Sequence, residues 1–113
     1  MNKDKIKWYI AGLIEVFEYN NSDRISACEN YYLIEANSLK LAKNKAFKIG
    51  KSIDSVECSD EKGKKGYLRF YGISSITPIY DEIKDGTEIL WTQYKKISKY
   101  QIKKIVKYPV PVS

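Results

Sequence analysis

Residues 8–18 read WYIAGLIEVFE, and this run of β-branched and aromatic residues is typical of a β-strand. Strand alternation gives it two apolar faces, with Trp8, Ile10, Ile14 and Val16 on one and Tyr9, Ala11, Leu13 and Phe17 on the other. Apolar side chains on both faces predict a central strand that is covered on both sides, at least in its first half. Gly12 interrupts the run and indicates a bulge or a close approach by another element.

A second strand is predicted to pair with this one. The segment NYYLIEA (30–36) has strand composition, and the polar loop YNNSDR (19–24) precedes it. An antiparallel hairpin is the simplest pairing of the two strands. Its connection would be about a dozen residues long, which is near the upper end of usual loop lengths.

A helix is predicted over residues 38–50. Asn37 or Ser38 can cap its start, and Gly50 can end it. Its apolar side chains form one stripe at helical spacing, made of Leu39, Ala42, Ala46 and Ile49. The two alanines of this stripe predict a helix that lies close against the sheet.

The chain after this helix is predicted to supply the remaining strands. A short strand is expected around Ser55–Cys58, and Tyr67–Ile73 has strand composition. Asp85-Gly86 is typical of a hairpin turn, which would pair Ile83 with Ile89 and begin a last strand, EILWTQY (88–94).

A competing interpretation of the same region is a short helix. Thr77 would cap this helix, Pro78 would occupy its first position and Gly86 would end it. We favour the strands over this helix.

The order of the predicted elements is typical of an α+β fold. We expect one domain over residues 1–113, because the length suits a single domain and suffices to bury a core without disulfides. It would contain an antiparallel sheet of about five strands, a central helix over 38–50 and a C-terminal amphipathic basic helix packed on the sheet. Residues 1–7 are expected to be a flexible N-terminus, and 109–113 a short C-terminal tail.

The segment KKISKYQIKKIVKY (95–108) carries the net charge of the protein. Fourteen basic and fourteen acidic side chains precede it, whereas residues 95–113 hold six lysines and no acid, so the whole net charge of +6 lies there. On a helical wheel, apolar side chains gather on one half, namely Ile97, Ile102, Ile105, Val106 and Tyr108. We therefore predict an amphipathic helix that Ser98 caps and that Pro109 limits.

The other half of this helix is a candidate surface for an anionic partner. Its predicted partner-binding residues are Lys96, Lys99, Tyr100, Lys103, Lys104 and Lys107. In the plainest interpretation, the apolar side packs on the sheet and the lysines are only solvated. In a second, the lysines and Tyr100 contact an acidic protein or a nucleic acid. A third, association with a membrane surface, requires a free apolar side, and we do not expect it.

The composition excludes several kinds of chemistry. The chain has no histidine, which excludes Ser-His-Asp and Cys-His catalysis and histidine metal sites. Cys28 and Cys58 match no metal or redox spacing, so we expect two reduced thiols and leave a disulfide between them open. We predict no catalytic residue and no cofactor.

The acidic side chains near the predicted hairpin turn are the one candidate for a metal site. They are Asp81, Glu82, Asp85 and Glu88, and carboxylate oxygens suit Mg²⁺ or Ca²⁺. In the strand interpretation, Asp81 and Glu82 point to opposite faces, so the cluster does not converge. We therefore expect a solvated hairpin edge without a metal, and keep a carboxylate-dependent metal hydrolase as the least favoured function.

The sequence predicts a cytoplasmic protein. No apolar run approaches the ~18 residues that a membrane span needs. The N-terminus, MNKDKIKWYIAGLIEVFE, does not look like a signal peptide, because Glu15 breaks its apolar stretch and no small-residue cleavage site follows.

Three stretches of the chain stand in a characteristic order and spacing: the opening WY of the first strand, NSLKLAKNKAFKIGK, and YLRFYGISSITPIYDEIKDGTEILW. Together they resemble a family of small bacterial and phage proteins that is classed only as a domain of unknown function. The likeness covers residues 8 to about 94 and is most specific at Phe70–Ile73, Asp81-Glu82 and the run from Asp85 to Glu88. The resemblance implies a compact α+β fold and brings no catalytic residue with it.

Size and composition together favour a non-catalytic binding protein. Tyrosine supplies ten of the 113 residues, and its side chain offers apolar area with a polar tip, which suits contact surfaces. We expect a protein that occludes or sequesters a partner, as bacterial immunity proteins and phage-encoded inhibitors of defence systems do. The alternative is a nucleic-acid-binding module that uses the basic helix. The oligomeric state is left open, with a dimer among the options.

Overall fold

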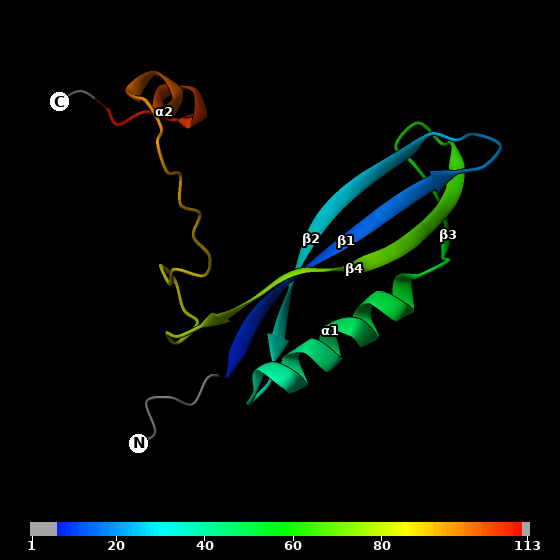
Figure 1. The fold of residues 1–113 in the computed structure, drawn as a ribbon, viewed down its shortest axis with the longest axis horizontal. Helices are drawn as coiled ribbons and strands as arrows, with labels where there is room; N and C mark the ends of the chain where they lie inside the picture. Colours follow the sequence, from blue (N-terminus) through cyan, green and yellow to red (C-terminus); the bar gives the residue numbers. More distant parts are fainter. Residues whose placement is uncertain (1–6, 112–113) are drawn as a thin grey trace.

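The computed structural model of the protein describes residues 7–111. The elements follow in the order β1 (Trp8–Tyr19), β2 (Ile25–Glu35), α1 (Leu39–Ile53), β3 (Glu57–Ser59), β4 (Lys65–Ile79) and α2 (Lys99–Ile105). The four strands form one curled antiparallel sheet in the order β2-β1-β4-β3 (Figure 1). The predicted α+β class is confirmed, but the sheet has four strands where about five were predicted. The predicted flexible N-terminus lies, apart from Lys7, outside the described residues.

β1 is a central strand, as its sequence predicts. It pairs with β2 in one unbroken register from Trp8↔Glu35 to Glu18↔Ile25, so the predicted hairpin is confirmed. β2 begins earlier than predicted, which shortens the connection to residues 20–24.

The predicted irregularity at Gly12 is confirmed. Gly12 pairs with Ser75 of β4 while its neighbour Leu13 pairs with Ile73, so Ser74 is an extra residue in β4. A Cβ atom on Gly12 would lie 2.5 Å from the Oγ of Ser74. Glycine suits this position because side chains of the bulged strand, Ser74 and Ser75, lie close to its Cα.

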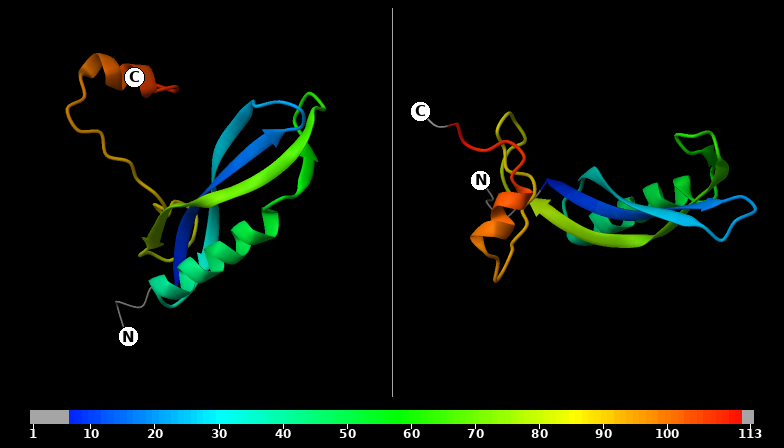
Figure 2. Two further views of the ribbon diagram at one scale, coloured as in Figure 1. Left: turned by 45° about the vertical axis from the view of Figure 1, so that its right-hand side comes forward. Right: turned by 90° about the horizontal axis from the view of Figure 1, so that it is seen from above.

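α1 covers one face of the sheet and closes the core (Figure 2). Ser38 caps the helix by accepting a hydrogen bond from the amide of Leu41, as predicted. Ala42 and Ala46 are completely buried, which confirms that small side chains let the helix lie close to the strands. The buried core cluster consists of Tyr9, Ala11, Leu13, Ile34, Ala36, Ala42 and Ala46.

The predicted end of this helix at Gly50 is wrong, because α1 continues to Ile53. Gly50 is instead a buried packing position that faces the ring of Phe70 on β4. The helix stops at Asp54, whose amide bonds to the carbonyl of Gly50 and whose Oδ1 accepts the amide of Phe70 at 2.9 Å.

The hairpin predicted around Asp85-Gly86 is also wrong. β4 runs through Pro78 to Ile79, which excludes the alternative helix too. Pro78 is tolerated because β3 pairs only with residues 65–67, so β4 is an edge strand at this end. Residues 80–98 form neither helix nor strand, and the turn at Gly86 (φ +87°) is closed by Thr87 through a 2.6 Å bond to the carbonyl of Glu82.

The predicted packing of the C-terminal helix on the sheet is not observed. α2 makes no extensive contact with α1 or with any strand of the described chain, and it lies apart from the sheet (Figures 1 and 2). The radius of gyration is 18.4 Å, whereas a compact domain of this length has one of roughly 13 Å. The residues after the sheet therefore extend away from the body of the protein.

One buried carboxylate is held by a tyrosine. Glu15 is 7% exposed and accepts a 2.5 Å hydrogen bond from the hydroxyl of Tyr32. This hydrogen bond, together with burial, raises the pKa of Tyr32 from 10.0 to about 12. Because the folded pKa exceeds the unfolded one, the stabilisation is complete below about pH 10 and is lost as the pH rises through about 12.

Replacing Tyr32 by phenylalanine is expected to lower the free energy of unfolding by about 1–2 kcal/mol at pH 7, because Glu15 then lacks its donor. Between pH 10 and 12 the variant should lose less stability than the parent, because it lacks the group with the raised pKa. Urea unfolding at several pH values measures both effects. Tyr31→Phe is the matched control, because the hydroxyl of Tyr31 bonds to the exposed Glu29. Equal pH profiles for the Tyr32→Phe variant and the parent would contradict this assignment.

Candidate partner-binding surface

The C-terminal segment forms a short capped helix. The hydroxyl of Ser98 accepts the amide of Gln101 at 3.1 Å, and the side-chain oxygen of Gln101 accepts the amide of Ser98 at 3.0 Å. This reciprocal capping box confirms Ser98 as the cap. The helix ends at Ile105, three residues before the predicted limit at Tyr108. We call residues 92–111 the C-terminal arm.

Most of the predicted partner-binding residues belong to α2, and the others lie just before or just after it in the chain. We call the set Lys96, Lys99, Tyr100, Lys103, Lys104 and Lys107 the lysine set. Lys99, Tyr100, Lys103 and Lys104 belong to α2 itself, whereas Lys96 precedes it in a left-handed conformation (φ 55°) and Lys107 follows its C-cap. The structure therefore brings four members onto one helix and leaves two on the flanking backbone.

Two tyrosines of the arm make cation–π contacts with lysines of the same arm. The Nζ of Lys104 lies 4.5 Å from the ring centre of Tyr100, one helical turn away, and the Nζ of Lys107 lies 5.5 Å from that of Tyr108. An ammonium over an aromatic face is attracted by the ring quadrupole. Each contact therefore places a lysine ammonium of the arm beside an aromatic ring.

The positive charges of the arm are not paired with acidic side chains in the described part of the chain. Within residues 7–111, no acidic side chain forms an ion pair with a lysine of the arm, and the two ion pairs observed there, Lys7–Glu35 and Arg69–Glu18, belong to the sheet. An uncompensated cluster of this kind attracts anionic partners over about a Debye length, which is ~8 Å at physiological salt.

The apolar side of α2 is exposed, contrary to the prediction that it packs on the sheet. Ile102, Ile105 and Val106 are 43–55% exposed. The arm thus presents a basic and an apolar side at the same time.

Sequence reasoning did not predict a second feature, the uncovered side of the sheet. We call the side of the sheet opposite α1 the open face. On β2 its apolar residues are Ile25, Tyr31 and Leu33, each at least 50% exposed. The alternation of these residues along the strand could have indicated an apolar second face. Ile25 was missed because β2 was predicted to start only at residue 30.

The segment after β4 folds back over one end of the open face. Ile83 and Ile89 line an almost wholly apolar cavity of about 240 Å³ with Ile10, Leu33 and Ile79. Ile10 is accordingly buried on this face. The predicted cover on the second face of β1 therefore exists over its first residues, and Val16, further along this face, is buried as well.

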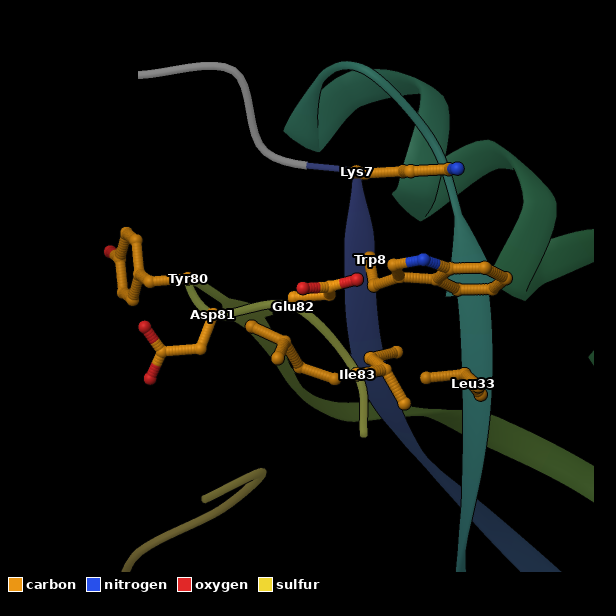
Figure 3. Close-up of a pocket in the computed structure, with 8 residues that line it drawn as sticks. Lys7, Trp8, Leu33, Tyr80, Asp81, Glu82 and Ile83 are labelled. Atoms are coloured by element: carbon orange, nitrogen blue, oxygen red, sulfur yellow. The ribbon is translucent and has the colours of Figure 1, made fainter. Parts of the chain in front are cut away.

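A neighbouring hollow of about 560 Å³ lies where β1, β2 and this segment meet (Figure 3). Figure 3 shows Trp8, Leu33 and Ile83 lying toward one another, while Tyr80 and Asp81 point away from them. Its polar rim, with Lys7 and Glu82, converges on no single point. The hollow resembles a contact surface more than a catalytic pocket.

The remaining candidates carry no visible chemistry. The acidic residues 81–88 surround an open hollow, and residues 7–111 contain no group of three or more metal-binding side chains. Cys28 is exposed on β2 and Cys58 is half-buried on β3, and both are free thiols, as expected. No helix in the described chain is long and apolar enough to cross a bilayer.

Comparison with known proteins supports the resemblance seen in the sequence. The model of a family described as a domain of unknown function (DUF4288) matches residues 8–91. The match spans the sheet, α1 and the segment that folds back over the open face, and it ends where the C-terminal arm begins. No curated protein and no solved structure matches the chain.

Proposed function

Because the chain belongs to the family of the domain of unknown function DUF4288, whose description names no activity, we propose its function from its exposed surfaces. We infer that it is a non-catalytic binding protein that captures and occludes an acidic protein partner through the lysine set of its C-terminal arm. The observation that carries this proposal is the display of α2 away from the sheet, with its lysines unpaired by acids of the described chain.

The division of charge supports this role. Residues 1–94 are neutral in sum, so the sheet contributes little net field, and the arm alone attracts an anionic surface. A positive arm and an exposed apolar patch on the same chain combine electrostatic attraction at long range with apolar contact at short range.

Replacing Lys99, Lys103, Lys104 and Lys107 by alanine together tests the proposal. Affinity capture from the source cell with the parent should recover an acidic partner, and the quadruple variant should lose it. The matched control removes four lysines from the exposed side of α1, at positions 40, 43, 48 and 51. This control has the same net charge as the variant and should still capture the partner. Equal capture by parent and quadruple variant would overturn the proposal.

A nucleic acid is the second candidate partner, favoured by the presence of six lysines and no acid in residues 95–113. In that case the affinity for a short DNA duplex falls steeply with salt, because each neutralised phosphate releases counterions. The quadruple variant should show a slope of log K against log salt that is shallower by roughly 0.9 per lost contact. Fluorescence anisotropy over a salt series measures this slope. Indistinguishable slopes for the parent and the quadruple variant would exclude this candidate.

A further inference from the structure

The open face carries an apolar patch that α1 leaves uncovered. The exposed side chains of Ile25, Tyr31 and Leu33 lie on β2, and Tyr67 lies on the same face at the far side of the sheet. The cavity lined by Ile10, Leu33 and Ile83 is continuous with them, because Leu33 belongs to both. The register also places Glu29, Glu18 and Arg69 on this face, between Ile25 or Tyr67 and the other two, so the apolar patch consists of Tyr31, Leu33 and the adjoining cavity. An exposed apolar patch with a polar rim is typical of an interface.

The C-terminal arm carries the complementary surface in the same chain. Among residues 7–111, twenty large apolar side chains are strongly exposed, and seven of them lie in the arm: Tyr94, Tyr100, Ile102, Ile105, Val106, Tyr108 and Val110. Every copy of the chain therefore carries two exposed hydrophobic surfaces. One lies on the open face of the sheet and the other on the C-terminal arm.

The accessible surface of the chain is larger than that of a compact monomer. The chain exposes 9528 Å², whereas a compact monomer of this length exposes roughly 6,400 Å². The surplus is roughly 3,000 Å² per chain. A standard stable interface buries only ~800 Å² per partner, so the surplus is ample for a permanent dimer.

We propose that the protein is a homodimer in which the arm of each copy covers the open face of the other. Ile102, Ile105 and Val106 of one arm would pack over Tyr31 and Leu33 of the second copy. We choose a second copy over the arm's own sheet because α2 lies apart from its own strands and makes no extensive contact with them (Figures 1 and 2). A reciprocal exchange also satisfies both surfaces of both copies and closes at two chains.

This assembly adds a property to the proposed function and does not depend on it. With their apolar sides docked, the two copies of α2 would present their lysines outward, giving two basic surfaces per assembly. A bivalent protein of this kind binds an extended or repeated anionic partner more tightly than one arm alone. Loss of dimerisation without loss of partner binding would separate the two proposals.

Molar mass by light scattering, measured over a range of protein concentrations, tests the exchange. The arm variant is Ile102→Glu with Ile105→Glu, and the face variant is Tyr31→Glu with Leu33→Glu. All four side chains are exposed within one copy, so each variant should keep the circular dichroism of the parent. The matched control is Leu39→Glu with Leu41→Glu, two exposed side chains in the first turn of α1.

If the arms are exchanged, the parent and the control should have the molar mass of a dimer. The arm variant and the face variant should each have the molar mass of a monomer. An equimolar mixture of the arm and face variants should regain mass, because the intact arm of one can dock on the intact face of the other. A monomeric parent, whether its arm docks on its own sheet or binds vesicles of anionic phospholipid, would overturn the proposal. So would a dimeric arm variant, which would point to pairing of β2 edges, or a mixture that stays monomeric.

Discussion

Replacing Leu13 by alanine is expected to lower the free energy of unfolding by about 2–5 kcal/mol, the range for emptying a buried leucine site. Leu13 is the only large side chain in the described chain that is fully buried. It lies on β1, the central strand, where the residues of α1 nearest the sheet are alanines that cannot fill a cavity. Since small domains are stable by only ~5–15 kcal/mol, this loss removes a large share of the stability of the domain.

Chemical unfolding followed by circular dichroism measures this loss. Leu39→Ala is the matched control, because Leu39 begins α1 with a side chain that is 57% exposed, and it should change the stability by no more than about 0.5 kcal/mol. Similar losses at both positions would show that Leu13 does not occupy the core.

The parts of the fold that follow local patterns could be predicted from the sequence. β1, the hairpin with β2 and α1 each have a periodicity and a bounding residue that agree, such as the alternation around Leu13 and the cap at Ser38. The end of α1 could not be predicted in this way. Gly50 is a typical helix stop, but here it is dictated by contact with Phe70, twenty residues away, which no local pattern contains.

The region after β4 was mispredicted because local and long-range signals disagree. Pro78 and Asp85-Gly86 favour a break and a turn, yet the pairing of β4 with β1 carries the strand through Pro78 to Ile79. The turn at Gly86 exists, but its flanks find no partner strand and instead place Ile83 and Ile89 over the open face.

The charge of the lysine set follows from the sequence alone, whereas its role in binding a partner stays a prediction. The position of α2 could not be predicted from the sequence. An amphipathic wheel shows that Ile102 and Ile105 need an apolar partner, but the identity of that partner depends on tertiary and quaternary structure. The same limit applies to the open face, whose exposure follows from where α1 does and does not lie.

Replacing Gly50 by alanine is expected to destabilise the protein by about 2 kcal/mol, as overpacking of a tight contact does. Helix propensity alone predicts the opposite sign, because alanine in a helix interior is more favourable than glycine by about 1 kcal/mol. The contact decides between them: a Cβ atom at this position would overlap the ring of Phe70. That ring cannot yield easily, because it packs edge-to-face on Phe47 with centres 6.2 Å apart. Its backbone is also held to Asp54 by a 2.9 Å hydrogen bond.

A double-mutant cycle measures this contact by urea unfolding of Gly50→Ala, Phe70→Leu and the combined variant. Leucine is smaller and more adaptable than phenylalanine, so the combined variant should be more stable than the sum of the two single losses predicts, by about 1 kcal/mol. The gain arises because the added methyl group partly fills the space that the ring leaves. A Gly50→Ala variant at least as stable as the parent would show that propensity governs this position and that α1 does not lie against Phe70.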